Sequence, residues 1–100
     1  MFIISIKYTK PEAEIDALLT AHHRFLKEQY AAGVFLMSGR KVPRSGGIIL
    51  AETADRADIE AIIQLDPFYS AGVAEYDIIE FVPTMTAEPL SAFQHIAERH

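Results

Sequence analysis

The chain has 100 residues, of which 50% are hydrophobic, and a formal net charge of −5 at pH 7. This length suits one domain with a real apolar core. The acidic balance argues against a general nucleic-acid-binding protein, which needs basic surface to neutralise phosphates. The absence of cysteine excludes disulfides, thiolate nucleophiles and cysteine-ligated zinc. The apolar start, MFIISIKYTK, is too short to span a bilayer and lacks the features of a signal peptide, so we expect a cytoplasmic protein without a membrane partner.

The first predicted element is a strand over residues 2–9, with the sequence FIISIKYT. The stretch is rich in Ile and Tyr, and the Lys10–Pro11 step bounds it, which is typical of a strand. Every second residue from Phe2 onward is apolar, whereas the alternate set is mixed. One face of the strand is therefore expected to meet a core.

A helix is predicted from Pro11 to just before Gly33. Proline suits a first helical turn because its missing N–H would have no partner there, and Thr9 and Glu12 stand at the spacing of a capping box. Apolar residues then recur at steps of three and four, the period of one helical face. Gly33 suits the position after the helix because glycine readily takes a left-handed conformation.

Two further strands, VFLMSGRKV (34–42) and GGIILAE (46–52), flank a hairpin loop that contains glycine and proline. A second helix is predicted for TADRADIEAIIQL (53–65), whose acidic residues crowd toward its start, where the helix dipole favours them. The segment VAEYDIIEFVP (73–83) gives a last strand.

The order of these elements is β-α-β-β-α-β, which is the ferredoxin-like α+β pattern. We expect residues 1–83 to form this domain and residues 84–100 to form a tail helix that packs on the domain or on a dimer partner. The tail carries apolar residues at roughly helical spacing: Leu90, Phe93, Ile96 and Ala97. The strands offer more apolar surface than two helices can cover, and exposed patches of that size usually mark interfaces. The sequence therefore predicts a homodimer that packs sheet against sheet.

His22 lies within the apolar stripe of the first predicted helix, three residues after Leu19 and three before Phe25. One interpretation is a core histidine bonded to a carbonyl, because burying an unpaired imidazole is costly. The other is a general acid or base, which requires a polar partner that orients the ring and fixes its tautomer. His23 is rotated by about 100° on the helix, so the two histidines are poorly placed to chelate one metal. No metal site is predicted.

Asp66 stands in QLDPFYSAG, after an apolar helical run and before a proline. Aspartate as N-cap and Pro67 in the first helical position explain both residues as the start of a short helix. Asp66 also continues the stripe of Ile59, Ile62 and Ile63, so it can point toward the interior that receives His22. The sequence leaves both interpretations open.

Three basic residues, Arg40, Lys41 and Arg44, fall within five positions in SGRKVPRSGG. One interpretation is a solvated hairpin tip. The other is a local anion site, in which Ser38 and glycine N–H groups assist the arginine side chains. Phe68, Tyr69 and Tyr76 are candidates for a pocket wall, although aromatic residues near a helix–strand junction are more often part of a core.

The stretches HHRFL, GVFLMSGR and DPFYSAGV, in this order and before a strand that ends in EFVP, resemble the YCII-related family over nearly the whole domain. The resemblance implies a ferredoxin-like fold that dimerises through its sheets. It also implies a His–Asp pair in a cleft, carried here by His22 and Asp66, with Ser38 and Gly39 in the segment that tends to line that cleft. A few members are linked to the breakdown of small molecules, and related dimeric α+β barrels act without metals.

The residues and the resemblance together lead to one hypothesis: a cofactor-free lyase or isomerase that transfers a proton on a small cyclic or aromatic-derived anionic compound. His22 would move the proton, Asp66 would hold the ring, and Arg40 or Arg44 would neutralise an enolate or carboxylate. The other candidate ligand-binding residues are Ser38, Gly39 and Phe68. The alternative is a non-catalytic dimer that binds a small ligand or a partner protein, in which Asp66 only caps a helix and His22 only packs.

Overall fold

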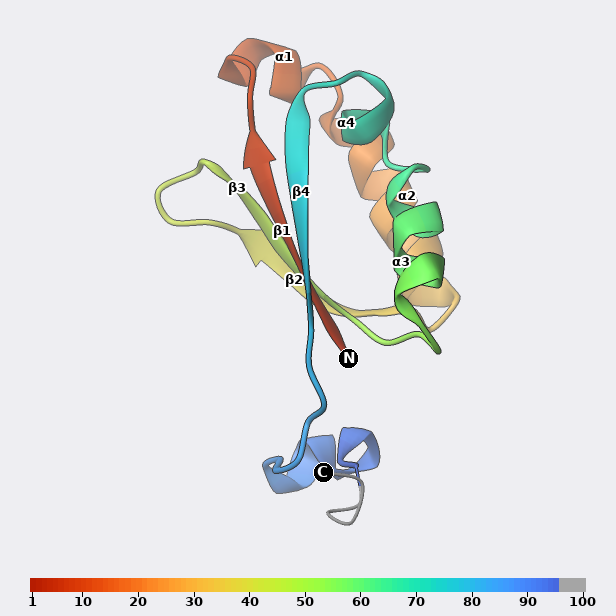
Figure 1. Cartoon of the computed structure of the whole chain (residues 1–100). Coiled ribbons are helices and arrows are strands. Elements are labelled where there is room, and N and C mark those ends of the chain that lie inside the picture. Colours follow the sequence, from red (N-terminus) through yellow and green to blue (C-terminus); the bar gives the residue numbers. More distant parts are fainter. Residues whose placement is uncertain (96–100) are drawn as a thin grey trace.

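The fold is a four-stranded antiparallel sheet with its helices on one face, as the computed structural model of residues 1–95 shows (Figure 1). The chain contains two β-α-β units, and a hairpin joins them. The elements in chain order are β1 (Phe2–Tyr8), α1 (Glu12–Asp16), α2 (Leu19–Ala31), β2 (Phe35–Arg40), β3 (Gly46–Ala51), α3 (Arg56–Ile63), α4 (Pro67–Ser70), β4 (Ala74–Glu80) and a 3₁₀ helix (Glu88–Phe93).

The strands lie in the order β2-β3-β1-β4, and every neighbouring pair is antiparallel. In this topology each helical segment carries the chain from one strand to a non-adjacent one, which is the ferredoxin-like arrangement predicted from the element order. The register places Ile4 of β1 opposite Ile49 of β3 on one side and Ile78 of β4 on the other. The predicted fold class is confirmed.

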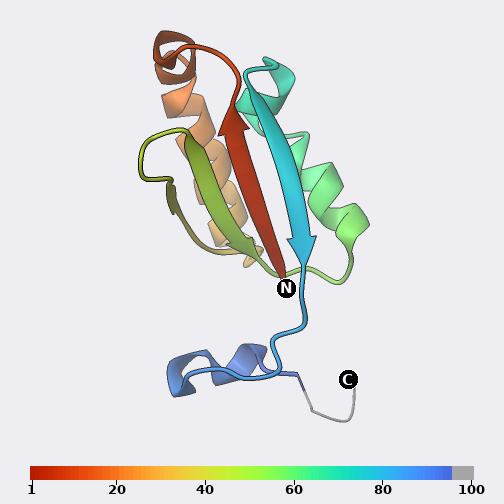
Figure 2. The same cartoon turned by 60° about the vertical axis from the view of Figure 1, so that its left-hand side comes forward.

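The main core lies between the sheet and the helices. Alternate residues of β1 point into it, and Phe2, Ile4 and Ile6 are each no more than 2% exposed. They meet the apolar faces of α2 and α3, including Phe25 and Ile59. Burying side chains of this size contributes roughly 1.5–3 kcal/mol each, so this layer provides most of the driving force that holds α2 against the strands. Figure 2 shows the opposite face of the sheet without a covering helix.

The predicted first helix is interrupted, because α1 ends at Asp16 and α2 begins at Leu19. The two segments pack in different places: Ile15 of α1 joins a small cluster with Phe68 and Val73, whereas Phe25 of α2 belongs to the main core. No glycine or proline lies between Glu12 and Ala32. The break therefore follows from tertiary packing and not from a helix-breaking residue.

The predicted capping box at the start of this helix does not form. The helix begins at Glu12, so Pro11 is the N-cap residue and no side chain caps it. Thr9 lies two residues too early, and its N–H instead donates to the carbonyl of Val73 at 2.8 Å, which ties β1 to the start of β4. The prediction for the other end is confirmed, because Gly33 takes a φ of 75°.

Beyond β4 the chain leaves the sheet and forms an arm over residues 83–95, which lies past the end of the domain in Figure 1. The predicted tail helix is a short 3₁₀ helix, Glu88–Phe93, where the structure describes it. Pro89 lies in its first turn. Ile96 and Ala97 lie outside the described residues, and packing of the arm on a partner stays a prediction. Within residues 1–95, no helix is both long enough and apolar enough to cross a membrane.

Candidate active site

A buried histidine and a buried aspartate meet where α2 approaches the junction of α3 and α4. His22 Nδ1 lies 2.8 Å from Asp66 Oδ1. His22 is 8% exposed and Asp66 is fully buried. The helical phase of α2 turns His22 toward the sheet with Phe25, three residues on, while Asp66 directly follows the buried face of α3. The predicted pairing of these two side chains is therefore present in the structure.

The Asp66 carboxylate accepts three hydrogen bonds. Its Oδ1 accepts from the backbone N–H of Phe68 at 3.0 Å as well as from His22, and its Oδ2 accepts from the hydroxyl of Tyr76 at 2.7 Å. The bond from Phe68 is the N-cap bond of α4, in which Pro67 occupies the first helical position. Capping and histidine pairing are thus carried by the same carboxylate oxygen, and a buried charge with several donors is far less costly than an unpaired one.

This arrangement fixes the proton positions on His22. Burial, and then the hydrogen bond to Asp66, raise the pKa of the Tyr76 hydroxyl above its ordinary value, so Tyr76 is a neutral phenol that donates to the carboxylate. Asp66 has only acceptors to offer, and His22 must therefore donate through Nδ1–H. In neutral imidazole the other nitrogen, Nε2, is then left with a free lone pair.

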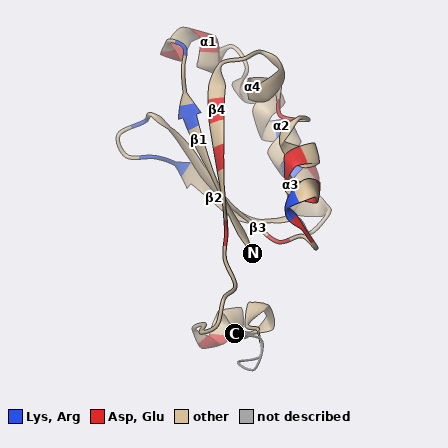
Figure 3. Cartoon of the chain, viewed as in Figure 1, with Lys and Arg blue, Asp and Glu red and all other residues tan. Residues whose placement is uncertain are grey.

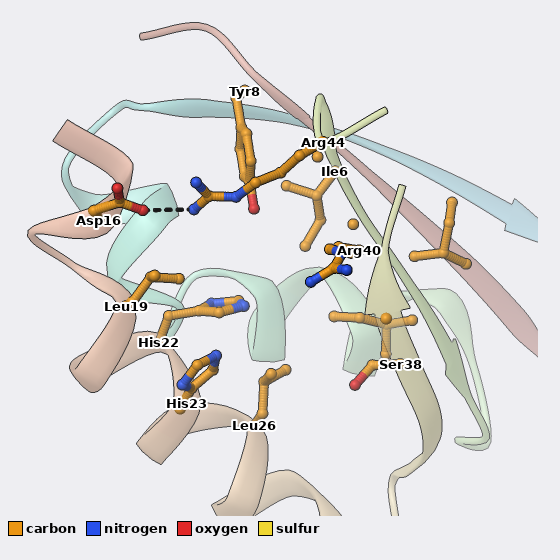
Figure 4. A pocket seen from close by; sticks show the side chains of 15 residues that line it. Ile6, Tyr8, Asp16, Leu19, His22, His23, Leu26, Ser38, Arg40 and Arg44 are labelled. Atoms are coloured by element: carbon orange, nitrogen blue, oxygen red, sulfur yellow. Dashed lines mark hydrogen bonds and ion pairs between the residues drawn. The ribbon is translucent and has the colours of Figure 1, made fainter. Parts of the chain in front are cut away.

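The Nε2 atom of His22 faces open space. Every buried side-chain nitrogen or oxygen of the described residues has a hydrogen-bond partner among them. Nε2 of His22 has no such partner, so this atom is not buried. His22 also lines a cleft, and Figure 4 shows its ring pointing into that cleft. A held ring with one bare nitrogen directed at a cleft is the geometry that a general base requires.

Phe68 packs against one face of the His22 ring. The two rings stack with centroids 4.1 Å apart and planes 12° apart, and the ring of Tyr8 meets Phe68 edge-on at 5.8 Å. Phe68 is 1% exposed and is absent from the cleft wall. The structure therefore places this predicted ligand-binding residue behind His22, where it restricts the tilt of the ring.

The cleft has a volume of about 530 Å³ and lies between α2, the end of α1 and the β2–β3 hairpin (Figure 4). Its walls combine apolar side chains with polar and charged ones. The lining residues are Ile6, Tyr8, Asp16, Leu19, His22, His23, Leu26, Ser38, Gly39, Arg40, Arg44, Gly46, Gly47, Ile48 and Ile49. A cleft of this size, with both apolar and polar groups on its walls, suits a small organic molecule that carries polar substituents.

Four of the predicted ligand-binding residues reach this cleft: Ser38, Gly39, Arg40 and Arg44. Ser38 Oγ lies 2.5 Å from the hydroxyl of Tyr30, so α2 holds the serine side chain in place. Figure 3 shows that Lys and Arg gather over this hairpin and the adjoining end of β1, whereas acidic residues lie on α1, α3 and β4.

The two arginines differ in their partners. Arg44 donates to Glu12 Oε1 at 2.9 Å and to Asp16 Oδ1 at 2.6 Å, which joins the hairpin to α1. The hydrogen bond to Asp16, with a further contribution from Glu12, raises the pKa of Arg44 above its ordinary value against an opposing effect of burial. Arg40 forms no ion pair with any residue in the part of the chain that the structure describes.

The sequence did not predict the hydrogen bonds that Tyr76 and Tyr30 form at the site, although Tyr76 was a candidate for a pocket wall. Tyr76 sits on β4, on the inward set of alternating residues, and its register partner in β1 is Ile6. Alternation along 73–83 could have identified its inward face, but not that its hydroxyl meets a carboxylate ten residues away in sequence. Tyr30 lies near the end of the first predicted helix, and nothing in the sequence links it to Ser38.

Comparison with known proteins supports the same fold. A solved structure of 5-chloro-2-hydroxyhydroquinone dehydrochlorinase from Burkholderia phenoliruptrix AC1100, in complex with 2,5-dihydroxybenzoquinone, is similar with a TM-score of 0.66 and 17% sequence identity, covering 83% of this chain and 95% of that one. A search of curated proteins finds no significant match. The profile of the YCII-related domain matches residues 1–82. The chain therefore belongs to the YCII-related family, as its sequence motifs predicted.

Proposed function

We propose that the protein is a small-molecule enzyme in which His22 transfers a proton to or from a cyclic or aromatic-derived compound. The observation that carries this proposal is the bare Nε2 of His22, held at the wall of a cleft by Asp66 through the opposite ring nitrogen. The similar dehydrochlorinase supports the choice of substrate class, since its name describes elimination from a hydroxylated ring.

In the proposed step, Nε2 of His22 takes a proton from a ring C–H or O–H group. The electron pair of the broken bond moves into the ring of the substrate, where an adjacent oxygen takes up the charge. Loss of a leaving group with that electron pair makes the reaction an elimination, and return of the proton to another atom makes it an isomerisation. In both cases all atoms and electrons come from the substrate, and the protein only moves the proton.

Asp66 and Tyr76 are positioning residues in this scheme. When His22 gains a proton its ring becomes cationic, and the Asp66 carboxylate at 2.8 Å offsets that charge. The Tyr76 hydroxyl fixes the second carboxylate oxygen at 2.7 Å, and Phe68 keeps the ring plane from tilting. The catalytic geometry is therefore preorganised before a ligand enters, which lowers the cost of reaching the transition state.

A panel of small hydroxylated rings, including 5-chloro-2-hydroxyhydroquinone, tests the proposal. Incubation in D₂O with detection of deuterium incorporation and chloride release reports proton transfer and elimination separately. We expect the wild type and Tyr69→Phe, which alters an exposed tyrosine outside the site, to act on at least one compound, and His22→Gln to lose about 10²–10⁴-fold in rate. Equal rates for His22→Gln and the wild type would overturn the proposal.

The non-catalytic alternative rests on a specific observation, because capping of α4 by Asp66 and stacking of His22 on Phe68 explain both residues structurally. Ligand binding without any exchange or turnover across the panel would favour this alternative. A protein that only packs His22 should also lose stability in His22→Gln without any change in the ligands it binds.

A further inference from the structure

The cleft contains two arginines, but only one carries a charge that the protein leaves uncompensated. Arg44 is bound by two carboxylates, Glu12 and Asp16, and this ion network joins the β2–β3 hairpin to α1. Asp16 is also the one carboxylate among the described residues that line the cleft. Arg44 is therefore neutralised before any ligand arrives.

Arg40 occupies a different electrostatic position. It lies two residues after Ser38 on β2, and alternation of a strand places both side chains on the inward face of the sheet. No carboxylate of residues 1–95 pairs with Arg40. Figure 4 shows its guanidinium group pointing into the cleft from the wall that faces His22. In a chain with a net charge of −5, Arg40 thus adds an unpaired positive charge to the wall of the cleft.

We propose that Arg40 is the anion-recognising residue of the cleft, and that the ligand is a singly charged organic oxyanion attached to a small apolar ring. This inference rests on the proposed function for the identity of the site, and it adds the charge of the substrate and the residue that selects it. Arg44 is assigned a structural role, as a link between the hairpin and α1.

The charge of the ligand follows from the count of free cations. A guanidinium group presents a planar fork of N–H donors that matches two oxygens of a carboxylate or of a delocalised enolate. A doubly charged group such as a phosphate would need a second cation, and Arg44 is already occupied by Glu12 and Asp16. One unpaired arginine therefore fits one negative charge.

The apolar side chains on the cleft walls indicate that the rest of the ligand is apolar. Leu19 and Leu26 lie on α2 one turn before and one turn after His22, and Ile6 and Ile49 form part of the sheet side. A flat ring between these walls would place one edge near His22 Nε2 and the opposite edge near Arg40. The anion would then sit away from the base, where it does not repel the electron pair that forms on proton removal.

Salicylate and its neutral isostere salicylamide are the test probes, with binding measured by calorimetric titration at low and moderate salt. We expect the wild type to bind salicylate about tenfold more tightly than salicylamide, the effect of one net charge-assisted hydrogen-bonded contact. Arg40→Gln should abolish this preference and leave salicylamide binding unchanged. Raised ionic strength should weaken the preference in the wild type, because the site is open to solvent.

Two further variants make the test selective. Arg24→Gln removes an exposed arginine outside the cleft lining and should keep the full preference. The triple variant E12Q/D16N/R44Q replaces the closed ion network by uncharged groups, and should also keep it. Retained preference in Arg40→Gln, its loss in the triple variant alone, or no preference in the wild type would each overturn the inference.

Binding separates this inference from the proposed function. His22→Gln should retain the preference for salicylate even where turnover is lost, because anion recognition does not need the base. Loss of turnover in His22→Gln with no role for Arg40 would sustain the proposed function and reject this inference. A salicylate preference that depends on Arg40, with no turnover by the wild type on any compound of the panel, would sustain this inference and reject the proposed function.

Discussion

His22 Nδ1 and Asp66 Oδ1 lie 2.8 Å apart although 44 residues separate them in the sequence. The same carboxylate oxygen caps α4 through the N–H of Phe68, so the start of a short helix also positions the proposed base. A local structural role and a role in the site therefore coincide in one residue. Substitutions at Asp66 can separate them.

Asp66→Asn and Asp66→Ala should differ in stability. Asparagine caps a helix about as well as aspartate, so Asp66→Asn should keep α4 while it removes the charge beside His22. Asp66→Ala leaves two buried donors and the half-buried hydroxyl of Tyr76 without their acceptor and should cost about 3 kcal/mol in the free energy of unfolding, measured by urea titration. Equal stabilities of the two variants would show that the carboxylate oxygens do not hold these donors.

Asp66→Asn should affect turnover much more than stability. Asp66→Asn should fold well and still lose most of the turnover that the wild type shows, because the neutral amide does not offset the charge of the imidazolium. A well-folded Asp66→Asn with wild-type turnover would remove Asp66 from the proposed mechanism.

Tyr76 should make the stability of the protein sensitive to high pH. The pKa of Tyr76 is raised in the folded protein by burial and by Asp66, so its contribution is fully present below the pKa of an unfolded tyrosine, about 10, and is lost as pH rises above that value. We expect the melting temperature of Tyr76→Phe to fall less between pH 9 and pH 11 than that of the wild type.

Tyr69→Phe is the matched control for this prediction, since Tyr69 is 47% exposed and close to Tyr76 in space. It should follow the wild-type pH dependence. At pH 7, Tyr76→Phe should cost about 1–3 kcal/mol, because Asp66 Oδ2 loses its donor. Identical alkaline profiles for Tyr76→Phe and the wild type would contradict the hydrogen bond to Asp66.

Gly46 is required by the close approach of β3 to β1 at the edge of the cleft. A Cβ atom at this position would lie 1.7 Å from the backbone oxygen of Ile6, whereas a Cβ at Gly39 would meet nothing within 4 Å. Gly46→Ala should therefore be destabilised by at least about 3 kcal/mol in urea unfolding, and Gly39→Ala by less than about 0.5 kcal/mol. Similar stabilities would contradict the register of β1 and β3.

The uncovered face of the sheet should form a homodimer interface. On this face Ile3 of β1 is flanked by Leu50 of β3 and Ile79 of β4 in register, and Ile79 is 49% exposed. Rows of apolar side chains of this kind are rarely left in water. Size-exclusion chromatography with light scattering should give twice the mass of the chain, and Ile79→Glu should give the monomer mass. A monomeric wild type at micromolar concentration would rule out this dimer.

The fold was predictable because its signals are local or periodic. Alternation in β1, the helical stripe around Phe25 and the glycine at position 33 each specify an element with little help from the rest of the chain. The break between α1 and α2 was not predictable, because it depends on which cluster Ile15 joins once the sheet has formed. The predicted tail helix is a 3₁₀ helix over Glu88–Phe93, and its packing on the domain or a partner stays a prediction.

The pairing of His22 with Asp66 was predictable, because each residue lies on an apolar helical stripe and within a stretch that resembles the YCII-related family. The state of each arginine was not, because Arg40 and Arg44 look alike in sequence and only the folded chain brings Glu12 and Asp16 to one of them. The same holds for Tyr76, whose link to Asp66 crosses from a strand to a helix cap. Contacts between side chains of different elements are decided by tertiary structure.

The tautomer of neutral His22 tests the proposed mechanism most directly, because His22 can act as the base in the cleft only if Nδ1 carries the proton. Long-range ¹H–¹⁵N NMR of the free protein, with His22→Gln used for assignment, should show neutral His22 with its proton on Nδ1, hydrogen-bonded to Asp66, and none on Nε2. A proton on Nε2, with Nδ1 bare, would contradict both the pairing with Asp66 and the role of His22 as the base.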